Sequence, residues 1–174
     1  MKKRILFAAV LALAAVLILA IPVSATQPYE ASGKMEWAGP PTNMSLREAG
    51  NNCFIVADLP YRFFDGNLEG IAGFHFNIVV HGVTCAASGP NQGHIGTLQA
   101  RGTFEGSVDG KEGTLELLFT MQEYSGDPGD LGLSGTVVIL SGTGELANLH
   151  GVLEVTNFIG DTFDTYSGGI HFDP

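Results

Sequence analysis

Residues 137–151, VVILSGTGELANLHG, decide how this chain folds, because they admit two incompatible interpretations. An apolar, strand-like run leads into a turn in which Gly142, Gly144 and Ala147 have the G-x-G-x-x-G/A spacing of a dinucleotide-binding site. A βαβ unit, however, needs a crossover of a dozen or more residues to reach a parallel strand. Here only the short stretch 145–150 precedes the next strand-like run. The segment therefore predicts a tight strand-to-strand corner with a short helical turn near 145–150, and no nucleotide cofactor.

Three stretches, 73–81, 97–105 and 114–122, alternate between apolar and polar side chains. Because successive side chains of a strand point to opposite faces, this period of two predicts strands with one buried face. That face holds Phe74, Phe76, Ile78, Val80, Leu98, Ala100, Gly102, Phe104, Leu115, Leu117, Phe119 and Met121. Asp109-Gly110 joins the last two stretches and is a strong signal for a two-residue hairpin turn.

Short strand-like runs continue along the rest of the chain, with no long amphipathic helical stretch between them. We expect further strands near 33–37, 53–58, 132–140, 151–158 and 166–172. Loops rich in polar residues, Gly or Pro are expected at 38–45, 86–94 and 124–130. The fold class predicted is therefore all-β, a single closed antiparallel β-barrel of about eight strands, because closure hides the sheet edges.

The N-terminus has the three parts of a signal peptide. Lys2-Lys3-Arg4 forms a basic start, an apolar run covers 5–21, and Val23-Ser24-Ala25 offers the small residues that a signal peptidase recognises. The alternative is a retained anchor helix, which the cleavage site and a preceding proline disfavour. We expect residues 1–25 to be removed, leaving a secreted single domain over 26–174 with no membrane attachment.

Charge narrows the classes of partner. Removal of the leader leaves five basic and 18 acidic residues, so the formal net charge moves from −10 to −13. An acidic surface of this kind repels nucleic acid and anionic lipid, which argues against both as partners.

The chain has two cysteines, Cys53 and Cys85. An export leader places them in an oxidising compartment, where a disulfide is the default. The alternative is a thiol nucleophile or a metal pair, but neither cysteine lies in a C-x-x-C motif or beside a histidine. We therefore predict a Cys53–Cys85 disulfide.

Three segments together resemble a known barrel superfamily. The glycine-rich turn over 141–151, in which Gly142, Thr143, Gly144 and Gly151 carry the pattern, resembles that of the allene oxide cyclase-like barrels. This superfamily includes plant dirigent proteins and an uncharacterised bacterial barrel family. The hairpin over 104–117 is similar to that of the bacterial family, and 166–172 would be the closing strand. The resemblance covers roughly 97–172 and implies an eight-stranded barrel with an apolar interior. It implies no reaction, because the polar site residues of these enzymes and dirigent proteins find no matching positions here.

Polar candidates for catalysis or metal binding are weak. His75 and His81 share a strand face but lie about 20 Å apart at strand rise, too far to share a metal ion, and no ligand spacing links the remaining histidines, His94, His150 and His171. The acidic stretches 127–130 and 161–164 lack the alternating pattern of a calcium loop and are interpreted as solvated turns. We expect no metal and no cofactor. Glu116 and Glu123, expected near the barrel mouth, are the only catalytic candidates, both weak.

The apolar face supports two interpretations of function. Its residues either fill the core of the barrel or line a pocket for a small hydrophobic molecule, and small barrels are usually filled. The candidate ligand-lining residues are Phe74, Phe76, Leu98, Phe104, Leu115, Leu117, Phe119 and Met121. The leading hypothesis is a secreted, non-enzymatic barrel that binds a small apolar molecule or serves as an extracellular structural module. The alternatives are an isomerase or cyclase acting on a small apolar substrate inside the barrel, and an interaction protein that uses its loops.

Overall fold

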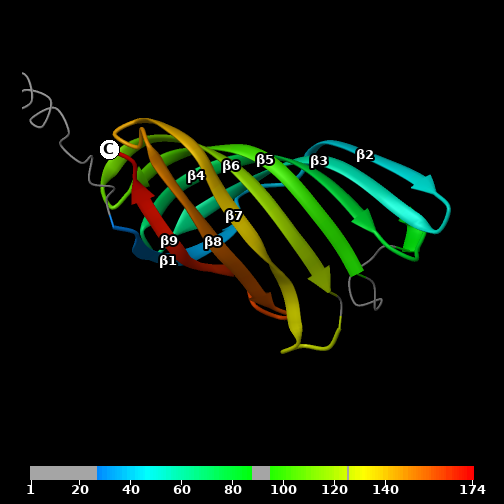
Figure 1. Ribbon diagram of the computed structural model, residues 1–174. Helices are drawn as coiled ribbons and strands as arrows, with labels where there is room; N and C mark the ends of the chain where they lie inside the picture. The colour runs from blue at the N-terminus through cyan, green and yellow to red at the C-terminus, as the bar shows by residue number, and fades with distance from the viewer. Residues whose placement is uncertain (1–26, 88–94, 125) are drawn as a thin grey trace, which may run out of the picture.

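A computed structural model describes residues 27–87, 95–124 and 126–174 of the chain. One antiparallel sheet of nine strands contains nearly all of them (Figure 1). The strands are β1 (Tyr29–Trp37), β2 (Thr42–Ala49), β3 (Asn52–Phe64), β4 (Leu68–Val80), β5 (Ile95–Val108), β6 (Lys111–Tyr124), β7 (Leu131–Gly144), β8 (Leu149–Phe158) and β9 (Asp164–Phe172). A single 3₁₀ turn, η1 (Cys85–Ala87), follows β4. The expected signal peptide, 1–25, lies outside the described residues.

Eight of the strands close in a ring, as the sequence predicts. The strand order is β1-β9-β8-β7-β6-β5-β4-β3-β2, and β1 pairs with β3 as well as with β9. The second half of β3 provides this closure, from Lys34↔Phe64 to Trp37↔Tyr61. Its first half pairs with β2 instead, so β2 is a ninth strand outside the ring. In Figure 1, β2 lies beside this part of β3, which remains paired with β4 on its other side.

Strand β2 corrects one expectation. The sequence predicts a loop over 38–45, but the chain becomes extended at Thr42 and pairs with β3 up to Ala49↔Asn52. A register shift between Thr42 and Ser45 and a positive φ at Asn43 interrupt the pairing. All eight residues of β2 are exposed, so no buried face imposes the alternation by which strands are found in a sequence.

The expected hairpin and its faces are confirmed. Val108 pairs with Lys111 across Asp109-Gly110, and both turn residues have the positive φ that a two-residue hairpin requires. Most of the side chains expected on the inner face are buried, whereas Ile78, Val80, Leu98 and Gly102 are half-buried.

The corner over 142–151 joins β7 directly to its antiparallel neighbour β8, which excludes a βαβ unit. The helical turn expected near 145–150 is shorter than predicted. A hydrogen-bonded turn covers Glu145–Asn148, and β8 already begins at Leu149. Gly142 is required by a close approach, because a Cβ there would lie 2.0 Å from the backbone oxygen of Leu146. Leu146 itself is fully buried and covers this end of the barrel.

Aromatic side chains fill the barrel interior. Tyr61 contacts Phe74, Phe76 and Phe119 with ring centroids 5.9–6.1 Å apart. Deeper along the barrel, the ring of Phe63 lies 5.6 Å from that of Phe104 and 5.7 Å from that of Tyr166. Because protein interiors pack as densely as organic crystals, rings at these separations leave a filled core.

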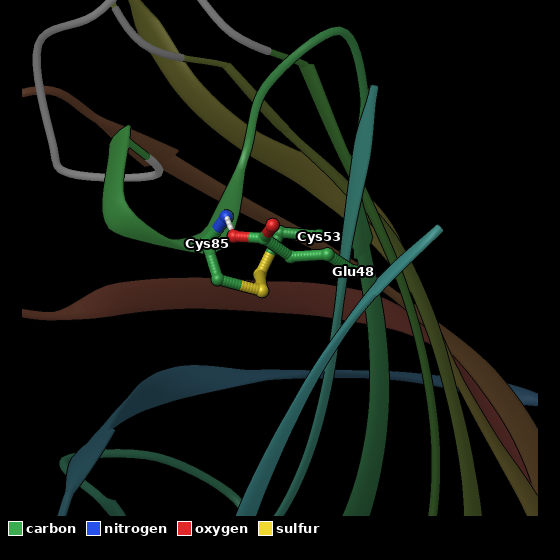
Figure 2. The surroundings of a disulfide bond; sticks show 3 residues. All are labelled: Glu48, Cys53 and Cys85. Atoms are coloured by element: carbon green, nitrogen blue, oxygen red, sulfur yellow. Dashed lines mark hydrogen bonds between the residues drawn. A yellow bond between two sulfur atoms is a disulfide. The ribbon is translucent and has the colours of Figure 1, made fainter. Parts of the chain in front are cut away.

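The predicted disulfide joins Cys53, at the start of β3, to Cys85 in η1 (Figure 2). Glu48 of β2 lies beside it, and a carboxylate oxygen of Glu48 accepts the Cys85 backbone N–H at 2.8 Å. Cys53 is fully buried. The disulfide and this hydrogen bond together fix the chain after β4 against the β2–β3 end of the sheet.

Candidate functional site

The two ends of the barrel differ in chemistry. At one end the fully buried side chains of Leu68, Val108, Leu146 and Leu149 close the core. There the Tyr166 hydroxyl accepts the backbone N–H of Leu68 at 2.9 Å. The opposite end, which we call the barrel mouth, contains a cavity with ionisable side chains. The mouth is therefore the candidate functional site.

The mouth cavity has a volume of about 280 Å³. Seven strands and the loop after β8 contribute to it, because all of them pass this edge of the ring. Its lining residues are Trp37, Tyr61, Leu98, Glu123, Tyr124, Gly132, Leu133, Asn157, Ile159 and Asp164. A cavity near the lower end of the range for ligand pockets, with apolar walls and a few polar groups, suits one small molecule.

Trp37 and Tyr61 form the aromatic wall of the mouth. The Trp37 side chain is 63% exposed, whereas Tyr61 is only 3% exposed. The indole N–H of Trp37 donates a hydrogen bond to the Tyr61 hydroxyl, and the two rings meet edge to face. The hydroxyl hydrogen of Tyr61 has no acceptor among the described residues. Burial raises the pKa of Tyr61 above its ordinary value, so this group remains a hydrogen-bond donor.

Two carboxyl groups face the same cavity. Asp164 is the first residue of β9, and Glu123 is the penultimate residue of β6. Loss of surrounding water raises the pKa of Asp164 to about 6, the charge of Glu123 adds to this effect, and a hydrogen bond from Asn157 opposes it. Desolvation also raises the pKa of Glu123, although Glu123 remains an exposed residue.

This arrangement has a definite chemical capacity. A carboxyl group with a pKa of about 6 takes up or releases a proton near neutral pH, as a general acid or base must. When both carboxyls are ionised, they attract a cation, and no Lys, Arg or His lies among the described lining residues to neutralise them. No Ser or Cys lines the cavity, so the described residues offer no hydroxyl or thiol nucleophile of that kind here.

A larger hollow, about 640 Å³, lies on the outer face of the barrel over β3–β6. Four of its polar side chains form hydrogen bonds in two pairs, His75 with Asp58 and Thr103 with Glu116. His75 Nδ1 lies 2.7 Å from an Asp58 carboxylate oxygen, and the Asn43 amide donates to the other oxygen at 2.6 Å. Because Asp58, His75 and Asn43 are already paired, whereas the Tyr61 hydroxyl hydrogen has no acceptor among the described residues, we favour the mouth over the larger hollow.

The structure separates the predicted site residues into three groups. Glu123 lies at the mouth, as expected, but Glu116 points outward from the middle of β6 and accepts a hydrogen bond from Thr103 at 2.8 Å. Of the eight candidate ligand-lining residues only Leu98 lines the mouth cavity. The other seven lie buried in the core: Phe74, Phe76, Phe104, Leu115, Leu117, Phe119 and Met121.

Sequence patterns do not identify three important residues of the mouth. The sequence predicts a solvated turn at Asp164, but Asp164 begins β9 and is only partly exposed. Trp37 and Tyr61 carried no motif. One signal was present: an acidic residue at the end of an apolar alternating run, as at Glu123, marks the rim of a barrel. Finding its partners requires the strand order, which sequence spacing does not give.

The described histidines are engaged with nearby polar groups. His81 lies 3.1 Å from the Thr97 hydroxyl, and His150 and His171 lie 3.5 and 3.2 Å from the Asp173 carboxylate. His94 lies outside the described residues. In the part of the chain that the structure describes, no three His, Cys, Asp or Glu side chains converge to hold a metal ion. Within the same residues, no helix is long and apolar enough to cross a membrane.

Comparison with known proteins places the chain in a family. No curated protein matches its sequence at a significant level. A crystal structure of a protein of unknown function from the DUF3224 family of Shewanella oneidensis MR-1 matches the fold with a TM-score of 0.65 at 19% identity, covering 85% of this chain and 99% of the other. The family model of DUF3224, described as a protein of unknown function, matches residues 44–166. The chain therefore belongs to the DUF3224 family.

Proposed function

We propose that this chain is an exported, non-enzymatic protein that binds one small, largely apolar molecule at the barrel mouth. The observation that carries the proposal is the unpartnered hydroxyl hydrogen of the buried Tyr61. A buried donor without an acceptor costs about 1–3 kcal/mol. An occupant of the cavity that supplies an acceptor removes this cost, and Leu98, Leu133 and Ile159 offer its apolar part a surface.

Because the barrel interior is packed with side chains, we place the proposed binding site at the mouth rather than in the interior. Aromatic rings at 5.4–6.1 Å separations occupy the space in which a ligand inside the barrel would lie. The mouth cavity is bounded on its inner side by one of these rings, that of Tyr61. A molecule bound there rests on the core rather than within it.

Two features support export. Residues 1–25 have the composition of a cleavable signal peptide. The disulfide between Cys53 and Cys85 persists in oxidising compartments such as the extracellular space. We propose, in addition, that the chain is an allene oxide cyclase-like barrel. The closure of eight strands and the glycine-rich corner at 142–151 support this relationship.

Native mass spectrometry of the exported protein tests the binding proposal. We expect a small non-covalent adduct to remain bound to the wild-type chain and to be depleted in Tyr61→Phe, which loses the hydroxyl and keeps the ring. The loss of one neutral hydrogen bond weakens binding about 2–10-fold. Tyr29→Phe, at the other end of the barrel, is the matched control and should retain the adduct.

A mouth that carries no adduct and is indifferent to a panel of small neutral and charged molecules with an apolar body contradicts the binding proposal. That result favours an extracellular structural module. Equal retention of the adduct by Tyr61→Phe and Tyr29→Phe places the bound molecule elsewhere.

The paired carboxyls favour one second candidate, an isomerase or cyclase that acts on a small apolar substrate. Asp164, with a pKa of about 6, would serve as the acid or base, and Glu123 would modulate it. An enzyme of this kind should turn over an unsaturated epoxide or a related substrate, and Asp164→Asn should abolish the turnover. Turnover that survives in Asp164→Asn, or its absence in the wild type over a substrate panel, removes this candidate.

A further inference from the structure

The mouth cavity is acidic and contains no balancing cation. Glu123 and Asp164 both line it, and neither forms an ion pair with any described residue. The charged residue types Lys, Arg and His are missing from its described lining. Two carboxylates that face one cavity repel each other, and a cation between them offsets this repulsion.

The walls of the cavity also suit an organic cation. Trp37, Tyr61 and Tyr124 contribute aromatic rings, and the negative face of such rings attracts ammonium groups. Leu133 and Ile159 add aliphatic surface. A hydrated inorganic ion would leave these side chains without a contact, whereas an ammonium group carried on an apolar body uses the carboxylates and the walls together.

The Tyr61 hydroxyl gives a second, independent indication of the ligand. Tyr61 lines the cavity and is only 3% exposed. Its hydroxyl oxygen accepts the Trp37 indole N–H, but its hydroxyl hydrogen has no acceptor within the described part of the chain. An ammonium group has no lone pair with which to accept this hydrogen bond. The ligand must therefore carry an oxygen acceptor in addition to its charge.

The cavity volume limits the size of the ligand. About 280 Å³ holds roughly nine water-sized groups at about 30 Å³ each. We infer that the mouth binds a small amino alcohol: an ammonium group and a neighbouring hydroxyl or ether oxygen on an apolar body of about ten non-hydrogen atoms in total. This inference rests on the proposed binding function and names the class of ligand for the same site.

Each polar group of the ligand then has its own partner. The ammonium group lies between Glu123 and Asp164, the oxygen accepts the Tyr61 hydroxyl hydrogen, and the apolar body packs against Trp37 and Leu133. An anionic ligand, such as a fatty acid, meets two like charges in the same place and is rejected.

Binding should strengthen as the pH rises from about 5 to about 7. The titratable groups that face the cavity are Glu123 and Tyr124 from β6, Asp164 from β9 and Tyr61 from β3, whereas β1, β5, β7 and β8 contribute only uncharged residues to its lining. Because the pKa of Asp164 is raised to about 6, its carboxylate gains charge over this interval. An aliphatic ammonium group stays protonated throughout.

The chain contains a built-in reporter for the experiment. Its one tryptophan, Trp37, lines the cavity, so its fluorescence follows occupancy of the mouth. Four probes of matched size separate the contributions: 2-amino-1-phenylethanol, 2-phenylethylamine, 2-phenylethanol and mandelate. We expect the amino alcohol to bind most tightly. The amine should bind at least about threefold more weakly and the neutral alcohol at least about tenfold more weakly, and mandelate should not bind.

Variants assign each contribution to a residue. Asp164→Asn and Glu123→Gln should each weaken binding of the amino alcohol at least about tenfold. The affinity for the neutral alcohol should change less than about threefold. Tyr61→Phe should remove the advantage of the amino alcohol over the amine. Glu105→Gln, an exposed carboxylate on the outer face of β5, is the charge-matched control and should bind all probes as the wild type does.

The outcomes distinguish the two levels of the proposal. Failure of every probe to bind overturns the proposed function itself. Neutral alcohol or mandelate binding as tightly as the amino alcohol overturns the cation inference and leaves small-molecule binding intact. Amine and amino alcohol binding equally in the wild type overturns the assigned role of Tyr61.

Discussion

The hydroxyl of Tyr166 in β9 accepts the backbone N–H of Leu68 in β4 at 2.9 Å, across 98 residues of sequence. Tyr166 also donates its own hydrogen to the Leu68 carbonyl at 3.4 Å. Gly33 and Gly66 leave the space for this contact, because a Cβ at either position would lie within 2.8 Å of the hydroxyl oxygen. The contact ties two strands that are not neighbours in the ring and closes the end of the barrel opposite the mouth.

Tyr166→Phe should destabilise the fold. The substitution keeps the ring but leaves the buried N–H of Leu68 without an acceptor, which costs about 1–3 kcal/mol. For a domain of this size each kcal/mol lowers the melting temperature by about 2–4 °C. Thermal unfolding followed by circular dichroism measures the change.

Tyr29→Phe is the control for this measurement. The Tyr29 hydroxyl donates to the Asp109 carboxylate at 2.9 Å, but Tyr29 is 38% exposed, so water replaces the lost bond. We expect a change within about 0.5 kcal/mol. Equal losses of stability in Tyr29→Phe and Tyr166→Phe would show that the buried Tyr166–Leu68 hydrogen bond contributes no more to stability than the exposed Tyr29–Asp109 hydrogen bond.

Removal of the disulfide should cost about 3–4 kcal/mol, because Cys53 and Cys85 close a loop with a sequence separation of 32. The double substitution of both residues by Ala, compared with the oxidised wild type in urea unfolding, measures this loss. A thiol-reactive label should find no free cysteine in the native exported protein. Quantitative labelling of both cysteines without unfolding would contradict the disulfide.

Much of the barrel could be predicted because its strands have one buried face. The alternation in β4, β5 and β6 and the Asp109-Gly110 turn are local patterns, and they identify the hairpin directly. β2 has no buried face, so nothing in its sequence distinguishes it from a loop. The pairing of β1 with β3, which closes the ring, could not be predicted from the sequence either, because it depends on β3 changing partners along its length.

The candidate site was harder to predict than the fold. Glu123 could be singled out because it ends an alternating strand, but Asp164 is distant in sequence and stands in a polar stretch that resembles a turn. Tyr61 alternates with other apolar residues and therefore looks like part of the core. What brings the three together is the convergence of β3, β6 and β9 at the mouth, a consequence of barrel closure.

Gly142→Ala should be strongly destabilising. Its Cβ would lie 2.0 Å from the Leu146 backbone oxygen, a contact that no side-chain rotation relieves. Overpacking of this kind costs about 1–3 kcal/mol or more. Gly169→Ala is the matched control in β9, where no atom lies within 4 Å of an added Cβ. Urea unfolding of both variants compares them, and similar stabilities would refute the close approach at the 142–146 corner.

The stability difference between Asp164→Asn and the wild type should depend on pH. Folding raises the pKa of Asp164 from 3.8 to about 6, so the folded protein holds this proton more tightly than the unfolded chain does. The stabilising effect is complete below about pH 4 and is lost as the pH rises through 6. Asn does not titrate, so the Asp164→Asn variant does not undergo this loss. Its free energy of unfolding should therefore rise relative to that of the wild type between pH 4 and pH 7.

The expected gain is on the order of 1–2 kcal/mol, after allowance for the solvent that reaches the mouth. Urea unfolding of both proteins at pH 4, 5, 6 and 7 measures it. The readout is how the difference between their free energies of unfolding changes with pH, not the absolute size of that difference. The side-chain substitution alone shifts the two curves by a constant amount. A difference that stays constant from pH 4 to pH 7 would therefore mean that the Asp164 carboxyl is fully hydrated, and it would remove the electrostatic basis for a cation site at the barrel mouth.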